Sequence, residues 1–126
     1  MLTVLLVSFL LGIAQTPVAE GGNLSPKQLA EMLRRDTTLI VVDVRTPEEH
    51  KQGHLRNSRL IDFYNAEFHA KLQTLPTNRT IVLYCRSGRR SEEAMKFLTS
   101  IGYSRVYHLH GGILAWKKER LTVVGP

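Results

Sequence analysis

The stretch Thr80-Ile-Val-Leu-Tyr-Cys-Arg-Ser-Gly-Arg-Arg-Ser91 predicts the fold class of this chain. Its opening run, TIVLY, is continuously apolar and β-branched, which is typical of a strand buried on both faces of a parallel sheet. An arginine- and glycine-rich loop follows, and after Ser91 the apolar residues recur at helical spacing up to Ile101. A buried strand that passes through a short loop into a helix is the repeating unit of an α/β fold.

The same alternation continues on both sides of this stretch. Other strands are expected at 39–44, 59–61 and 105–109, and helices at 26–35, 47–53, 65–73, 91–101 and 113–120. Ser25-Pro-Lys-Gln28 and Thr46-Pro-Glu-Glu49 are capping boxes with proline at the first helical position. We therefore expect a single α/β domain with a mostly parallel central sheet and helices on both faces.

Composition narrows the class of protein further. The chain has 126 residues, of which 43% are hydrophobic and 22% charged, an ordinary balance for one globular domain. No apolar run reaches the 18 residues of a membrane-spanning helix, so no stable span is expected. The net charge of +6 favours anionic partners, but no nucleic-acid-binding module is recognisable and no nucleic acid is expected.

The sequence pattern at the N-terminus is typical of a targeting signal. Residues 4–14, VLLVSFLLGIA, have the length of a signal-peptide core, and small residues allow cleavage after Ala14 or Ala19. We expect residues 1–19 to be a signal peptide and residues 20–126 to be an exported, periplasmic domain. The alternatives are a buried N-terminal helix or an uncleaved anchor.

Cys85, the only cysteine, directly follows the strand at 80–84. Ligands of an open α/β sheet bind outside the carboxyl ends of the strands. A loop with a central glycine turns successive N–H groups inward and forms an anion cradle at a helix N-terminus. These amides and the nearby arginines should lower the pKa of the thiol and favour the nucleophilic thiolate. The alternative is a buried cysteine that acts as a small hydrophobic side chain.

Several landmarks of this chain resemble, in the same order, those of rhodanese (thiosulfate sulfurtransferase) domains. The loop Cys85–Arg90 fits the C-x-x-G-x-R active-site pattern of that family. The other similar segments are Asp43-Val-Arg45, Glu49, Gly53-His54-Leu55 and Leu109-His-Gly-Gly-Ile-Leu-Ala-Trp116. The likeness runs from about Leu24 to Leu121 and implies a single-domain, exported member of the family.

The resemblance implies a sulfurtransferase that works by two-step covalent catalysis. The Cys85 thiolate would take a sulfane sulfur from a small anionic donor such as thiosulfate and pass it to a thiol or to cyanide, protein thiols included. The residues expected to bind the donor are Arg86, Ser87, Gly88, Arg89, Arg90 and Ser91, with Arg90 also bracing the loop. No cofactor and no metal is expected, because His108 and His110 on one strand lack a third ligand.

Asp43, Arg45 and Glu49 are expected to support the site. Asp43 and Arg45 are two residues apart at a strand end, so both point to one face and are expected to form an ion pair beneath the active loop. In the larger two-domain thiosulfate enzymes, a substrate-binding arginine stands at the position of Glu49. The resemblance therefore leaves the natural donor open.

Two rival functions remain. Cysteine phosphatases and arsenate reductases of the same fold follow C-x5-R, but the sixth position after Cys85 is Ser91, and Arg90 comes one residue earlier. The second rival is a non-enzymatic carrier that binds a persulfide or an anion and delivers sulfur to a partner. We expect the chain to be a monomer.

Overall fold

The computed structural model describes residues 21–126, in which strands and helices alternate along the chain. The strands are β1 (Gly22–Leu24), β2 (Ile40–Asp43), β3 (Arg59–Leu60), β4 (Ile81–Tyr84) and β5 (Val106–Leu109). The helices are α1 (Pro26–Arg35), α2 (Pro47–Lys51), α3 (Phe68–Leu72), α4 (Arg89–Ser100) and α5 (Gly112–Lys118). The expected signal peptide lies outside the described residues. Within them, no helix is both long and apolar enough to cross a membrane.

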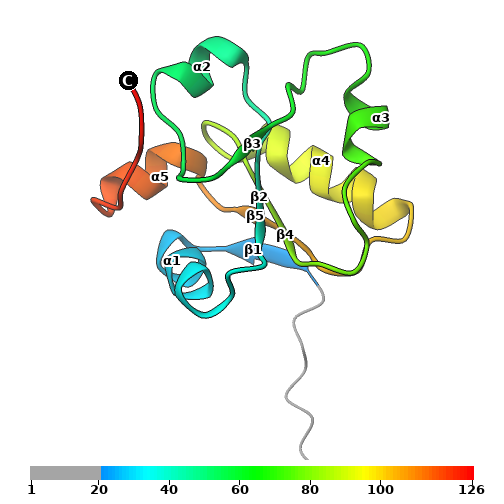
Figure 1. The fold of residues 1–126 in the computed structure, drawn as a ribbon, viewed down its shortest axis with the longest axis horizontal. Coiled ribbons are helices and arrows are strands. Elements are labelled where there is room, and N and C mark those ends of the chain that lie inside the picture. The colour runs from blue at the N-terminus through cyan, green and yellow to red at the C-terminus, as the bar shows by residue number, and fades with distance from the viewer. Residues whose placement is uncertain (1–20) are drawn as a thin grey trace, which may run out of the picture.

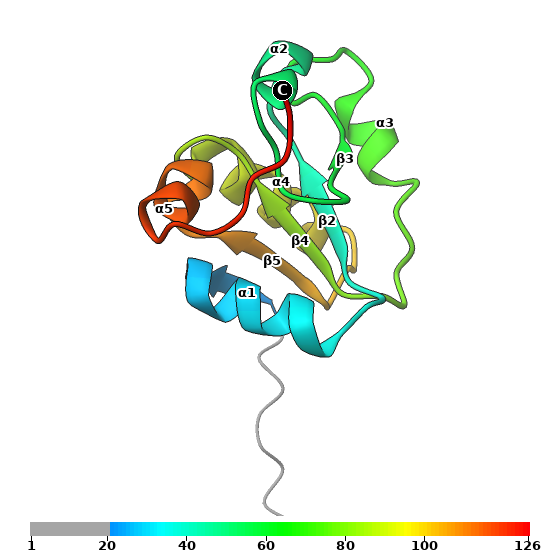
Figure 2. The same ribbon diagram turned by 60° about the vertical axis from the view of Figure 1, so that its left-hand side comes forward.

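The five strands form one parallel sheet in the order β1-β5-β4-β2-β3. Helices α3 and α4 cover one face of the sheet and α1 and α5 cover the other (Figures 1 and 2). The expected α/β fold, with helices on both faces of a parallel sheet, is confirmed. Because the strands are parallel, their carboxyl ends meet at one edge of the sheet.

Strand β4 lies at the centre of the sheet and contributes to two separate cores. Val82 and Tyr84 pack in the core that includes α1 and α5, whereas Ile81 and Leu83 pack in the core that includes α3 and α4. Successive side chains of a strand point to opposite faces, and this alternation produces the two sets. Cys85 continues the alternation and lies in the core of α3 and α4.

Two helices begin two or three residues away from their expected starts, and α5 begins at Gly112, one residue before its expected start. The expected start at Asn65 is wrong, because the Asn65 side chain accepts a hydrogen bond from the backbone N–H of Glu67 in a local turn and α3 begins only at Phe68. Helix α4 begins at Arg89, two residues earlier than expected, because the left-handed conformation of Gly88 (φ 110°) turns the chain into the helix there.

Candidate active site

The loop between β4 and α4 holds Cys85 at the carboxyl edge of the sheet. Gly88 takes the left-handed φ of 110° that the reversal requires, and a Cβ there would lie 3.4 Å from the backbone nitrogen of Gly111. The turn therefore favours glycine, whereas the Gly111 segment lies at ordinary van der Waals distance. The result is a short loop whose amides turn back toward the sulfur of Cys85.

The Cys85 sulfur is buried and surrounded by hydrogen-bond donors. Its residue is 1% exposed, the N–H of Gly88 donates to Sγ over 3.1 Å, and the Ser91 hydroxyl lies 3.5 Å from Sγ. Burial opposes ionisation, but hydrogen bonds from the Ser91 side chain and from the amides of Ser91, Gly88 and Ser87 outweigh it and lower the pKa of the thiol. The site thus favours the thiolate, the reactive form of cysteine.

The start of α5 holds the loop from the other side. The N–H of Ile113 donates to the carbonyl of Cys85 over 2.9 Å, and the N–H of Leu114 donates to the carbonyl of Arg86 over 3.2 Å. This contact depends on Gly112, where a Cβ would lie only 2.3 Å from the Arg86 carbonyl oxygen. The glycine pair Gly111-Gly112, at which α5 begins, is therefore part of the candidate site.

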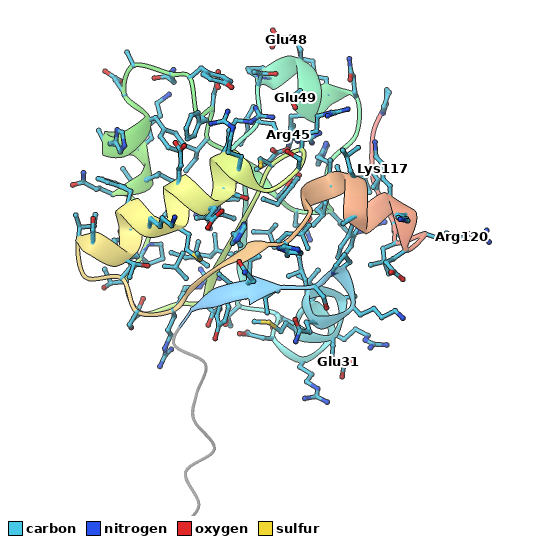
Figure 3. The ribbon with its side chains drawn as sticks, turned by 180° about the vertical axis from the view of Figure 1, so that it is seen from behind. Glu31, Arg45, Glu48, Glu49, Lys117 and Arg120 are labelled. Atoms are coloured by element: carbon cyan, nitrogen blue, oxygen red, sulfur yellow. The ribbon has the colours of Figure 1, made fainter. Side chains whose placement is uncertain are left out.

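Arg90 connects the loop to α2. Its guanidinium donates to both carboxylate oxygens of Glu49, over 2.9 and 3.0 Å, and lies 5.7 Å from the centre of the Tyr64 ring. The hydrogen bonds from Arg90 lower the pKa of Glu49 to about 2, and Thr46 adds to this effect by donating within the capping box of α2. Figure 3 labels Glu49 and Arg45 toward the α2 end of the molecule and Glu31 at the opposite end.

Three of the predicted donor-binding residues lie at the surface around the buried sulfur. Arg86, Ser87 and Arg89 are exposed, and Arg89 lies 3.5 Å from Glu93, one helical turn further along α4. Arg90 and Ser91, in contrast, are buried. The structure thus separates the six loop residues into an exposed basic rim and a buried floor.

Asp43 and Arg45 form the expected ion pair, with 2.7 Å between Arg45 Nη2 and Asp43 Oδ2. Asp43 also accepts from the hydroxyl of Tyr84 over 2.8 Å and contacts His50 Nδ1 over 2.9 Å. Burial opposes ionisation of Asp43, yet its hydrogen bonds with Arg45 and His50 lower its pKa. Arg45 in addition donates to the carbonyl of Gly53 over 2.7 Å. The pair lies on the Tyr84 side of the sheet, across from the Cys85 side chain, where it fixes the segment that follows α2.

His108 of β5 contacts the loop through Ser91, a role that the sequence alone does not predict. His108 is 3% exposed, and its Nδ1 lies 3.0 Å from the Ser91 hydroxyl, while His110 is exposed. The only indication of this role is that a polar residue occupies a buried position of a strand. That position is recognised as buried only when the neighbouring strands are known. Asn23 of β1, which completes this contact at Nε2, gives no local signal at all.

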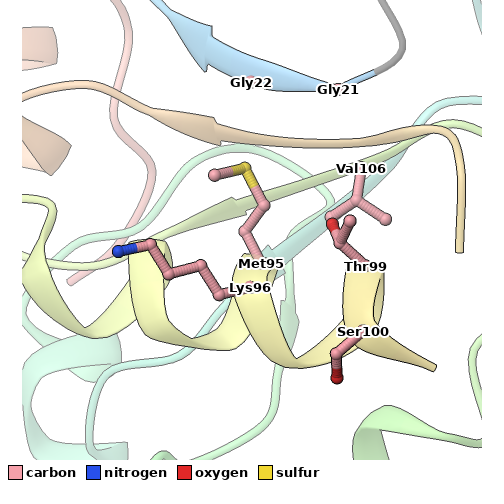
Figure 4. A pocket seen from close by; sticks show the side chains of 7 residues that line it. All are labelled: Gly21, Gly22, Met95, Lys96, Thr99, Ser100 and Val106. Carbon is pink, nitrogen blue, oxygen red and sulfur yellow. The ribbon is translucent and has the colours of Figure 1, made fainter.

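Other parts of the described structure do not offer comparable chemistry. Among residues 21–126, no group of three or more His, Cys, Asp or Glu side chains could hold a metal ion. A groove of about 480 Å³ between β1 and the second half of α4 is lined by Met95, Thr99 and Val106, among others (Figure 4). Val106 begins β5, so this groove lies at the amino end of the sheet, away from Cys85.

Comparisons with known proteins agree on the type of domain. A family model described as a rhodanese-like domain matches residues 25–119. A sulfurtransferase of Allochromatium vinosum is 35% identical over 79% of this chain and 92% of its own length. The thiosulfate sulfurtransferase GlpE of Ectopseudomonas mendocina is 31% identical, over 79% of this chain and 88% of its length.

Solved structures agree with these relatives. The crystal structure of a rhodanese-related protein from Thermoplasma volcanium superposes with a TM-score of 0.72, at 29% identity, over 81% of this chain and 96% of that chain. Longer proteins also match, and this chain spans only 26% of one and 33% of another.

Proposed function

The chain belongs to the rhodanese-like domain family, and from this premise we propose that it is a thiosulfate-type sulfurtransferase with Cys85 as the nucleophile. The observation that carries the proposal is the buried Cys85 sulfur, which accepts a hydrogen bond from the Gly88 amide beneath a rim of exposed arginines. Two relatives of similar length are named as sulfurtransferases, one of them for thiosulfate. An anionic donor fits this arrangement because amides and arginines both attract negative charge.

In the first step, the Cys85 thiolate attacks the outer sulfur of the donor. A bond forms between Sγ and that sulfur, the sulfur–sulfur bond of the donor breaks, and the remainder leaves with the electron pair, as sulfite when the donor is thiosulfate. The product is a persulfide on Cys85.

In the second step, an acceptor thiolate or cyanide attacks the terminal sulfur of the persulfide. The bond between this sulfur and Sγ breaks, its electron pair returns to Sγ, and the Cys85 thiolate is restored. The acceptor becomes a persulfide, or thiocyanate when it is cyanide. The lowered pKa of the Cys85 thiol favours this step too, because a more stable thiolate is a better leaving group.

The test is transfer of sulfur to the protein and from it. After incubation with thiosulfate, the intact mass of the wild-type chain should rise by one sulfur atom and fall again after treatment with cyanide. In Cys85→Ser the mass should not change, and turnover should fall by several orders of magnitude while the circular dichroism spectrum stays that of the folded protein. Substantial turnover in a folded Cys85→Ser protein would contradict the covalent mechanism.

A phosphate-ester assay run beside this one tests the rival phosphatase. In the structure, the residue that stands at the sixth position after Cys85 is Ser91, which is buried, and Arg90 is engaged by Glu49. Both features disfavour the binding of a phosphate in the loop. Faster hydrolysis of an aryl phosphate than transfer of sulfur would overturn the proposal. Persulfide formation without turnover would indicate a carrier.

A further inference from the structure

A chain of polar contacts runs from Cys85 through the buried Ser91 and His108 to the exposed Asn23 of β1. The Ser91 hydroxyl lies 3.5 Å from the sulfur and 3.0 Å from Nδ1 of His108, and Nε2 of His108 lies 2.5 Å from Oδ1 of Asn23. Ser91 and His108 are 0% and 3% exposed. Buried polar groups of this kind are retained only when each has a partner, so the contacts are specific.

The topology of the sheet creates this chain of contacts. Strand β5 lies between β1 and β4, and the register of the parallel pair places Asn23 directly beside His108. Ser91 lies in the first turn of α4, which packs on β5. Three segments that are far apart in the sequence therefore form one connected path that begins at the sulfur of Cys85.

The number of hydrogens in this chain is smaller than the number of acceptors. Because Oδ1 of Asn23 can only accept, the hydrogen of a neutral His108 resides on Nε2, and its Nδ1 must accept. The Ser91 hydroxyl then has one hydrogen for three acceptors, namely Nδ1 of His108, the carbonyl of Gly88 at 3.1 Å and the sulfur. A second proton on His108 would convert Nδ1 into a donor and release the Ser91 hydrogen for the sulfur.

We propose that His108, acting through Ser91, receives the proton that leaves Cys85 when the thiolate forms. The thiol proton moves to the Ser91 oxygen while the Ser91 hydroxyl proton moves to Nδ1 of His108. The products are a thiolate, a Ser91 hydroxyl that donates to it, and an imidazolium that donates through Nε2 to Asn23. The number of protons is unchanged and no electrons are transferred. His108 thus acts on Cys85 through Ser91: it holds the proton that leaves the thiol, and it is a positioning residue that does not touch the reacting sulfur.

The groups around His108 favour its imidazolium form only when Cys85 is a thiolate. Burial lowers the pKa of His108, and the charged groups that act on it are Glu92 and Lys96 of α4 and His110 at the end of β5. Glu92 and Lys96 are themselves 3.5 Å apart in an ion pair, and Glu92 alone of these groups favours the imidazolium. An isolated imidazolium is therefore disfavoured, whereas a thiolate one hydroxyl away compensates for its charge.

This inference deepens the proposed function, because it rests on Cys85 as the reactive thiol. It is nevertheless tested without any sulfur donor, since both pKa values can be measured on the resting protein. If the pKa values of Cys85 and His108 depend on each other but the protein transfers no sulfur, only the proposed function is refuted. If the protein transfers sulfur but the two pKa values are independent, only the proton transfer through Ser91 is refuted.

The first measurement is the pH profile of alkylation by iodoacetamide, which reports on Cys85 alone because the chain has one cysteine. The Asn side chain in His108→Asn can still accept a hydrogen bond but cannot hold the proton. The pKa of the Cys85 thiol should therefore rise by about one unit. At a pH below the thiol pKa of both proteins, this rise means about tenfold less thiolate. The matched control His110→Asn removes an exposed histidine from the same segment and should leave the profile unchanged.

A double-mutant cycle then tests the path. If His108 acts through Ser91, the effect of His108→Asn should vanish in a Ser91→Ala background. If the two effects on the thiol pKa add, His108 acts independently of Ser91 and the relay is wrong.

The second measurement does not require a folded His108 variant. Nitrogen-15 NMR of the imidazole should give a higher pKa for His108 in the wild type than in Cys85→Ala, since the thiolate stabilises the imidazolium. Equal values in these two proteins would overturn the proposal.

Discussion

At the scale of single residues, the three arginines of the loop differ in their surroundings. Arg90 is 8% exposed and its charge is matched by the carboxylate of Glu49. Arg86 and Arg89 are exposed, and the contact of Arg89 with Glu93 is 3.5 Å long between two well-solvated side chains. Attraction of an anionic donor from solution is therefore assigned to Arg86 and Arg89, and positioning of the loop to Arg90.

The first prediction concerns these two exposed arginines. Replacing both Arg86 and Arg89 by Gln should raise KM for thiosulfate by about tenfold and flatten its dependence on ionic strength, because electrostatic steering acts over about 10 Å at 0.1 M salt. The effect on kcat should be smaller, since neither side chain breaks a bond. Steady-state kinetics across a salt series provide the measurement.

The control for charge is the pair Arg34 and Arg35, both exposed at the end of α1. Arg34→Gln with Arg35→Gln removes the same net charge from a remote surface and should leave KM unchanged. Equal effects of the two double variants would show that only the net charge of the molecule matters.

At the scale of elements, the packing of α5 on the loop depends on one glycine. In Gly112→Ala, the new Cβ would lie 2.3 Å from the Arg86 carbonyl oxygen at a φ of 62°, so both the backbone and the loop must shift. We expect a loss of about 3 kcal/mol in the free energy of unfolding and a large loss of thiolate at neutral pH. Urea unfolding and the alkylation profile of Cys85 measure the two effects.

Gly102 is the matched control for this variant. It also has a positive φ, 103°, but a Cβ there meets no atom within 4 Å. Gly102→Ala should therefore cost only the backbone strain, about 1 kcal/mol, and leave the alkylation profile unchanged. Similar losses in the two variants would mean that contact with Arg86 has no importance.

Elements with a local signal were predictable from the sequence, and elements that depend on distant pairing were not. Helices α1 and α2 begin where their capping boxes predict, because Ser25 and Thr46 bond to residues three positions on. Strand β1 has three residues and gains its hydrogen bonds only from β5, over eighty residues later, so no local pattern reveals it.

The same distinction applies to the candidate site. Cys85 and its loop are contiguous in the sequence, and the chemistry of that segment could be predicted from residue types and order. The sequence also pointed to an ion pair of Asp43 with Arg45, but its position relative to Cys85 required the alternation of the folded strands. The contact of His108 with Ser91 and Asn23 required the order and the register of the sheet.

At the scale of the whole molecule, the ion pair of Glu49 with Arg90 joins segments 41 residues apart and adds a pH dependence to stability. Because the folded protein lowers the pKa of Glu49 from 4.5 to about 2, this contribution is complete above 4.5 and is lost as the pH falls through about 2. Glu49→Gln should therefore lower the free energy of unfolding at neutral pH by about 1 kcal/mol. The difference from wild type should shrink in urea titrations over that acidic range.

Glu93→Gln is the comparison for this prediction, because it breaks an exposed pair of Arg89 on the same helix. Such pairs contribute little, so the variant should unfold like the wild type at both neutral and acidic pH. If the Glu49→Gln difference does not depend on pH, the pair contributes through packing and not through charge.

The burial of Cys85 also determines which products form when the protein is oxidised by oxygen. A disulfide between two molecules requires sulfur atoms about 2 Å apart, but each Cys85 residue is only 1% exposed beneath its own loop. Two folded copies therefore cannot bring these atoms together, and covalent dimers are blocked by shape even though each molecule carries a reactive thiol. Storage in oxygen should oxidise the Cys85 thiol and leave the protein monomeric. A reductant is therefore needed to keep the thiol reactive, and not to prevent disulfide-linked dimers.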